Sequence, residues 1–232
     1  HKLHYREETD PDYIYFPACV TRIFGASALH KDDLMTVILR IAGKAGVRVS
    51  LPAEAHGLCC SQIWEHKGNV EGQKITANRT VACFYDWSER GRIPIFCDTT
   101  SCTHTLLSET GGNILTPENQ EKYKQLKIID ITQWLNEIIL PKIKEIKPKN
   151  RVLLHPTCSC QIMNLTPVML DIARKCAREV ILPDNWGCCG ASGDRGFIFP
   201  ELSESATRDE RYAISDQQFD GCYSLARTCE IV

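Results

Sequence analysis

The sequence has no long apolar run and no excess of charge of either sign. Its apolar runs, such as Ile138–Leu140, are far shorter than the about 20 residues of a membrane-spanning helix. The formal net charge is −2, with 27 Lys and Arg against 29 Asp and Glu. Nucleic-acid binders usually carry a basic patch or stripe, so we expect no nucleic-acid partner. Neither the nucleotide-binding pattern G-x-G-x-x-G nor the ferredoxin run C-x₂-C-x₂-C-x₃-C-P occurs.

Cysteine, in contrast, is abundant, with thirteen among 232 residues. Disulfide scaffolds are usually shorter chains with a higher cysteine content. Because the number is odd and His1–Asp10 does not read as a signal peptide, we expect reduced thiols that act as metal ligands or redox groups. We therefore expect a cytoplasmic location or a peripheral one on the inner face of the cell membrane. The chain also begins and stops abruptly, and we expect it to be a piece of a longer polypeptide.

Three landmarks recur in the same order in the two parts of the sequence. Each part has an apolar run that ends in Pro-x-Cys, then Leu-Pro followed by two adjacent cysteines, and finally a single late cysteine. The cysteines are Cys19, Cys59, Cys60 and Cys102 in the first part and Cys158, Cys188, Cys189 and Cys229 in the second. An ordered repeat of this kind predicts two related halves. We place them at 1–128 and 151–232, joined by a linking helix and loop at 129–150.

Between these landmarks, helical and strand patterns alternate. Leu34–Ile41 has the spacing of one helical face, and short apolar runs at 47–51 and 93–96 are typical of strands. Such alternation predicts an α/β fold in which each half has a small, mostly parallel sheet flanked by helices. Each cysteine landmark follows a predicted strand. Because the carboxyl ends of parallel strands share one edge, we expect the cysteines of each half to meet there as a thiolate cage.

Three or four thiolates favour either zinc or an iron–sulfur cluster. Adjacent cysteines bind one tetrahedral ion with difficulty because their side chains diverge, whereas they can bind different irons of one cluster. This favours an iron–sulfur centre in the cage of each half, with the eight landmark cysteines, four in each half, as the ligands. For Cys97 and Cys222 two roles stay possible: each is either a ligand or a buried residue that packs beside the site. His56 and His155 each precede a landmark, and each is either a hydrogen-bond donor to cluster sulfur or a loop histidine without a role. Cys83, Cys160 and Cys176 favour packing.

These motifs resemble the duplicated cysteine-rich CCG domain. That family includes the iron–sulfur subunit of glycolate oxidase and the cysteine-rich subunit of heterodisulfide reductase. More narrowly, Phe16–Gly25 and Arg227–Glu230 resemble the C-terminal region of bacterial FAD-linked D-lactate dehydrogenases. The heterodisulfide reductase pattern ends each half in C-x-x-C, whereas this chain has Cys97-x₄-Cys102 and Cys222-x₆-Cys229. A fifth ligand in each half therefore stays an open question.

The resemblance implies a module with one or two iron–sulfur clusters, of 4Fe–4S type. It would take electrons from an FAD held upstream in the same polypeptide, beyond a ferredoxin-like domain, and pass them to a quinone or cytochrome acceptor. The parent enzyme would then oxidise a D-2-hydroxy acid such as D-lactate, with no substrate chemistry in this part of the chain. Two alternatives stay open: a thiol–disulfide reductase with substrate sulfur bound at a cluster, and a structural zinc module.

Overall fold

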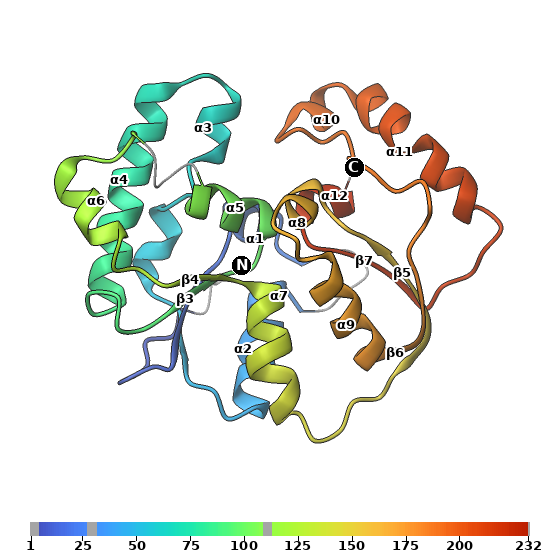
Figure 1. The fold of residues 1–232 in the computed structure, drawn as a ribbon, viewed down its shortest axis with the longest axis horizontal. Helices are drawn as coiled ribbons and strands as arrows, with labels where there is room; N and C mark the ends of the chain where they lie inside the picture. The colour runs from blue at the N-terminus through green and yellow to red at the C-terminus, as the bar shows by residue number, and fades with distance from the viewer. Residues whose placement is uncertain (1–4, 27–31, 109–112, 232) are drawn as a thin grey trace. The chain divides into compact units, whose positions relative to one another are not determined.

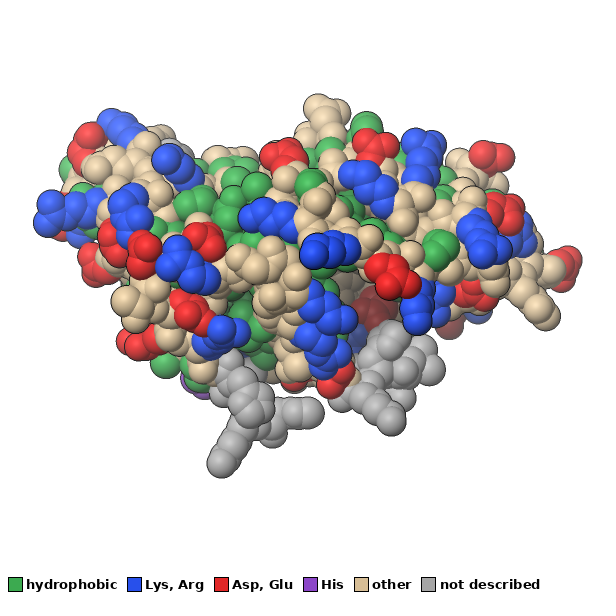
Figure 2. All heavy atoms as spheres, turned by 90° about the horizontal axis from the view of Figure 1, so that it is seen from below, with side chains coloured by type: hydrophobic (Ala, Val, Ile, Leu, Met, Phe, Trp, Pro, Cys, Tyr) green, Lys and Arg blue, Asp and Glu red, His purple; other side chains and the backbone are tan. Residues whose placement is uncertain are grey.

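The chain forms two compact units, His1–Lys142 and Ile143–Val232. A computed structural model describes residues 5–26, 32–108 and 113–231. Each unit is α/β with a parallel sheet and flanking helices, which confirms the predicted fold class (Figure 1). Within the described residues, no helix is both long enough and apolar enough to cross a membrane. On the face shown in Figure 2, Lys and Arg side chains are interspersed with Asp and Glu.

The first unit contains a four-stranded sheet in the order β2-β1-β3-β4. Its strands are β1 (Tyr13–Phe16), β2 (Val49–Ser50), β3 (Ile95–Cys97) and β4 (Ile128–Asp130). Its longer helices are α2 (Leu34–Lys44), α4 (Val70–Trp87), α5 (Thr100–Ser108) and α6 (Pro117–Tyr123). Short helices are α1 (Cys19–Phe24), η1 (Ala53–Gly57), α3 (Gln62–His66) and α7 (Ile131–Gln133).

Aromatic side chains fill the core on both faces of this sheet. Phe96 of β3 stacks on Tyr15 of β1, with ring centroids 5.0 Å apart, and on Trp134 at 4.2 Å. Phe16 meets Phe84 of α4 edge to face at 4.8 Å. All five side chains are fully buried. Parallel strands covered on both faces consist mainly of apolar residues, which explains the continuous apolar runs of β1 and β3.

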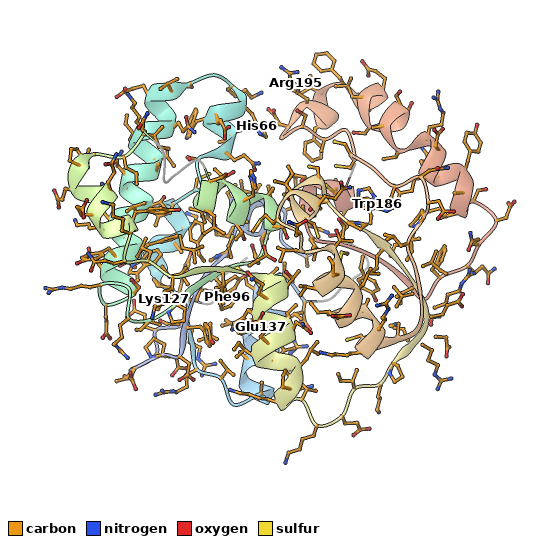
Figure 3. The ribbon with its side chains drawn as sticks, in the orientation of Figure 1. His66, Phe96, Lys127, Glu137, Trp186 and Arg195 are labelled. Atoms are coloured by element: carbon orange, nitrogen blue, oxygen red, sulfur yellow. The ribbon has the colours of Figure 1, made fainter. Side chains whose placement is uncertain are left out.

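The segment predicted to link the halves, 129–150, lies largely within the first unit. β4 pairs with β3 in parallel, and Trp134 is buried against Phe96. The linking helix is therefore core structure: α7 continues into a π-helical turn, η2 (Trp134–Ile139), and then into η3 (Leu140–Lys142). Figure 3 labels Phe96 beside the helical segment that carries Glu137. The stack of Trp134 on Phe96 explains why this segment belongs to the first unit rather than to a linker, because the stack anchors the segment to the sheet.

The second unit contains a three-stranded parallel sheet in the order β6-β5-β7. Its strands are β5 (Lys149–His155), β6 (Ala177–Ile181) and β7 (Gly221–Ser224). Its helices are α8 (Cys158–Ile162), α9 (Thr166–Cys176), α10 (Arg195–Ile198), α11 (Pro200–Ile214) and α12 (Arg227–Ile231). In both units the central strand is the first, and a pair of helices leads from it to an outer strand. The units therefore repeat one plan.

Candidate metal centre

The thiols of the first half follow the carboxyl ends of three neighbouring strands. Cys19 is the first residue of α1, just after β1, and the adjacent pair Cys59–Cys60 comes after β2. Cys97 ends β3, and Cys102 lies in the first turns of α5. In the order β2-β1-β3, the chain passes from β1 to the neighbour on one side and then crosses to the neighbour on the other side. Ligands of open α/β sheets bind at such a switch point.

Five thiols of the first half form a continuous series of interactions. Hydrogen bonding to Cys59 is the largest cause that raises the pKa of Cys19. Hydrogen bonds from Cys102 and Cys59 lower the pKa of Cys60. Hydrogen bonding to Cys60 and Cys97 raises the pKa of Cys102. The fold thus brings together thiols that are far apart in the sequence.

The second half also gathers its thiols. The sulfur atoms of Cys189 and Cys229 lie 2.8 Å apart in a hydrogen bond. This contact lowers the pKa of Cys189 and raises that of Cys229. Cys158 and Cys188 lie close enough that their charges also raise the pKa of Cys229. The other three predicted thiols of this half therefore all act on Cys229.

One interaction joins equivalent cysteines in the two halves. Cys60 interacts with Cys102, and Cys189 interacts with Cys229. In each case the second member of the adjacent pair is the thiol whose pKa is lowered. Because the thiolate is the form that binds metals, each half favours one anionic sulfur at the same place in its fold.

Backbone amides also surround the sulfur atoms of both adjacent pairs. Each of these sulfurs accepts a hydrogen bond from the N–H group two residues further along the chain. The four donor and acceptor pairs are Ser61 to Cys59, Gln62 to Cys60, Gly190 to Cys188 and Ala191 to Cys189. Successive N–H groups of this kind make a concave site for anions, and such sites are common around iron–sulfur clusters.

A buried carboxylate fixes the loop that carries Cys19. Asp98, which follows Cys97 at the end of β3, accepts a hydrogen bond from the Tyr15 hydroxyl at 2.6 Å and one from the Ala18 amide at 2.8 Å. Burial is the largest cause that raises the pKa of Asp98. These contacts tie the ends of β1 and β3 together and so fix two thiol-bearing segments relative to each other.

Two further side chains hold the loop before the first adjacent pair. The guanidinium group of Arg22 donates to the carbonyl oxygens of His56 and Leu58, both at 2.5 Å. The Thr80 hydroxyl donates to the carbonyl oxygen of Cys59 at 2.9 Å. Because α1 carries Arg22 and α4 carries Thr80, this loop is fixed from both sides.

The residue after each adjacent pair has a left-handed backbone. Ser61 has φ = 78° and Gly190 has φ = 75°. Glycine adopts this conformation without steric cost, whereas an L-residue loses roughly 1–2 kcal/mol. The Cys-Cys-Gly of the second half and the Cys-Cys-Ser of the first therefore form turns of the same conformation.

We expect Ser61→Gly to stabilise the first unit by about 1 kcal/mol, because it removes left-handed strain at a small cost in backbone entropy. The Ser61 side chain is fully buried, and its hydroxyl has no hydrogen-bond partner among the described residues. Denaturant unfolding of the metal-free chain measures the change. Ser61→Ala is the control, since it removes the hydroxyl but keeps the strain. Equal gains from both variants would attribute the effect to the hydroxyl.

Strand register identifies the counterpart of Cys97 in the second half. Phe16, at the end of β1, pairs with Cys97, and His155, at the end of β5, pairs with Ser224. Both Phe16 and His155 precede a Pro-x-Cys, and the last predicted ligand of each half follows five residues after Cys97 or Ser224. Serine therefore takes the position of the fifth thiol.

Cys222, which the sequence offered as a candidate, lies two residues before that position. Its side chain is exposed, and burial raises its pKa with no contribution from a neighbouring thiol among the described residues. Cys160 is buried in the core with Leu154 and Met169. Cys83 on α4 and Cys176 on α9 are partly buried, and for both thiols burial is the largest cause that raises the pKa.

The two candidate histidines differ in their surroundings. His56 is exposed, and its carbonyl oxygen, the acceptor for Arg22, takes part in fixing the loop. His155 is partly buried and bonded to Glu210 of α11, and its pKa is coupled to the charge of Cys189. Sequence reasoning missed Glu210 and Ser224. Comparing the spacing Cys97-x₄-Cys102 with Ser224-x₄-Cys229 would have identified the serine, whereas no sequence signal pointed to Glu210.

Within residues 5–26, 32–108 and 113–231, no group of three or more His, Cys, Asp or Glu side chains is arranged to hold a single metal ion. No disulfide joins any of the thirteen cysteines, all of which lie in the described part of the chain. The donor chemistry of each half fits an iron–sulfur cluster, since several soft sulfurs lie together and backbone amides point at them. No model of a known protein family matches this chain, and no curated protein matches it either. The gathered thiols are therefore the basis for assigning a function.

Proposed function

We propose that the chain is an electron-transfer module in which each half holds an iron–sulfur cluster. The observation that carries this proposal is the interaction of Cys60 with Cys102 and of Cys189 with Cys229 at equivalent places in two repeated folds. In the first half, Cys19, Cys59, Cys60, Cys97 and Cys102 are the proposed ligands. In the second half, the proposed ligands are Cys158, Cys188, Cys189 and Cys229.

The surroundings of the first set suit electron transfer better than substrate chemistry. Cys60, Cys97 and Cys102 are all buried, so the sulfur atoms are shielded from water. When bound, the cluster would supply a site that gains or loses one electron. The protein tunes such a cluster through burial, charge and hydrogen bonds to sulfur, and the amide donors at each adjacent pair are groups of this kind.

The electron source and acceptor follow from the sequence resemblance. A flavin domain upstream in a D-2-hydroxy-acid dehydrogenase, with D-lactate as the substrate in view, would deliver electrons to this module, and a quinone or cytochrome would accept them. A cytoplasmic or inner-membrane-surface location belongs to the same proposal. The arrangement of reduced thiols supports it, because free thiols are expected in a reducing compartment.

Anaerobic reconstitution of the chain with iron and sulfide tests the proposal. We expect brown protein with iron and acid-labile sulfide bound in comparable amounts, and an EPR signal upon reduction. A sample that stays colourless and EPR-silent after anaerobic reconstitution would overturn the proposal. Tight binding of zinc in place of iron, at one ion per half and without sulfide, would assign a structural zinc module instead.

A further inference from the structure

His155 joins the second set of thiols to a buried carboxylate. It ends β5, three residues before Cys158, and its Nδ1 lies 2.8 Å from Oε2 and 3.0 Å from Oε1 of Glu210. The two side chains are 15% and 8% exposed, so the pair is largely shielded from water. Since an ionised carboxylate only accepts hydrogen bonds, Nδ1 carries the proton in this contact.

The other ring nitrogen of His155 is buried and unused. Nε2 has no hydrogen-bond partner among the described residues. A buried polar atom without a partner costs free energy, so such an atom commonly marks a missing contact. His155 ends the strand that leads into Cys158, and its charge and that of Cys189 each change the pKa of the other, so the ring is within electrostatic range of the second set of thiols.

The first half has no equivalent group. Phe16 occupies the position of His155 in the strand register, and its ring packs against Phe84 in the core. The two halves therefore differ at two paired positions: Phe16 with Cys97 in one, and His155 with Ser224 in the other. A thiol is replaced by a hydroxyl, and an inert ring is replaced by a polar one held by a carboxylate.

We propose that His155 donates a hydrogen bond from Nε2 to sulfur at the centre of the second half, with Glu210 as the positioning residue. A donor to sulfur stabilises the more negative, reduced form of a cluster and so raises its reduction potential. With five thiols and no such imidazole, the first half has the lower potential. Of the two centres, the second would therefore be the one that is more easily reduced, and its Cys158 and Cys188 are exposed.

This inference rests on the proposed function, and an EPR-monitored redox titration of the reconstituted chain tests it. We expect His155→Phe, which copies the first half, to make the reduced form of the second centre about tenfold less favourable, a shift of about 59 mV to lower potential for one electron. Glu210→Gln should shift the same centre in the same direction by less. The first centre should keep its potential in both variants. His66→Phe, at an exposed position labelled in Figure 3, is the control.

The Cys60→Ser variant disrupts the first set of thiols, so the EPR signal that it retains belongs to the second centre. An unchanged potential in His155→Phe, with both centres loaded, would overturn the inference and leave the proposed function intact. If His155→Phe does not load the second centre, His155→Gln decides the matter, because its amide can still donate. Loading of His155→Gln with a potential near that of the unaltered chain supports the hydrogen bond. Failure of His155→Gln to load as well would overturn the inference, because a hydrogen-bond donor at this position would then not be sufficient. Absence of iron in the unaltered chain would refute the proposed function itself.

Discussion

Replacing Cys189 with serine is expected to remove the second centre and leave the first one loaded. Cys189 is buried, contacts Cys229 at 2.8 Å and accepts a hydrogen bond from the Ala191 amide. Its lowered pKa makes it the favoured thiolate of its half. A serine hydroxyl stays protonated at neutral pH and is a poor ligand for iron, so the second cluster loses its central donor.

Iron and sulfide content per chain, measured after anaerobic reconstitution, should fall to about half, with the loss of one EPR component. Cys60→Ser should remove the other component, since Cys60 has the same place in the first half. Cys176→Ser is the matched control, because Cys176 lies on α9 and burial is the largest influence on its pKa. Full iron content in Cys189→Ser, or an equal loss in Cys176→Ser, would contradict the assignment of ligands.

Gly190→Ala is expected to destabilise the second unit by about 3 kcal/mol. A left-handed backbone costs an L-residue roughly 1–2 kcal/mol, and crowding in a packed site adds a similar amount. At φ = 75°, a Cβ atom on residue 190 would lie 2.7 Å from the carbonyl oxygen of Leu202 and 2.9 Å from the Cα of Ser203. Both atoms belong to the backbone of α11, so the clash cannot be relieved by a side-chain rotation.

Denaturant unfolding of the metal-free chain, followed by circular dichroism, measures this loss in the transition of the second unit. Gly187→Ala is the control in the same loop, since a Cβ atom there meets nothing within 4 Å among the described residues. We expect that control to unfold at nearly the same denaturant concentration as the unaltered chain. Similar losses in both variants would show that the loop needs flexibility in general rather than one left-handed residue next to Cys189.

The sequence was sufficient to predict the fold class, because parallel α/β units leave a simple pattern. Buried strands such as Tyr13–Phe16 are continuous apolar runs, and the helix at Leu34–Lys44 shows its buried face in its spacing. The sequence pattern did not predict that residues 129–142 belong to the first unit. Their inclusion in the first unit depends on the stacking of Trp134 on Phe96, a contact between residues that are 38 positions apart.

The part of the candidate site that consists of cysteines was predictable, because cysteine is a residue type with a specific chemistry. Repeated cysteines identified the interacting thiols, but a count of cysteines could not separate Cys97 from Cys222, since each lies a few residues before the last predicted ligand of its half. Only the register of β7 on β5 shows that Ser224 is the counterpart of Cys97. Glu210 lies 55 positions from His155 on an amphipathic helix, where glutamate usually faces solvent, so its burial depends on tertiary packing.

The unequal exposure of the two sets of thiols determines which set is oxidised first when the protein is exposed to air. Cys158 and Cys188 are open to solvent, whereas Cys60, Cys97 and Cys102 are enclosed. Dioxygen and peroxide reach open sulfur first, and the thiolate is the form of sulfur that they oxidise. Damage should therefore begin in the second half, and because each half supplies its own ligands, repair there need not disturb the first.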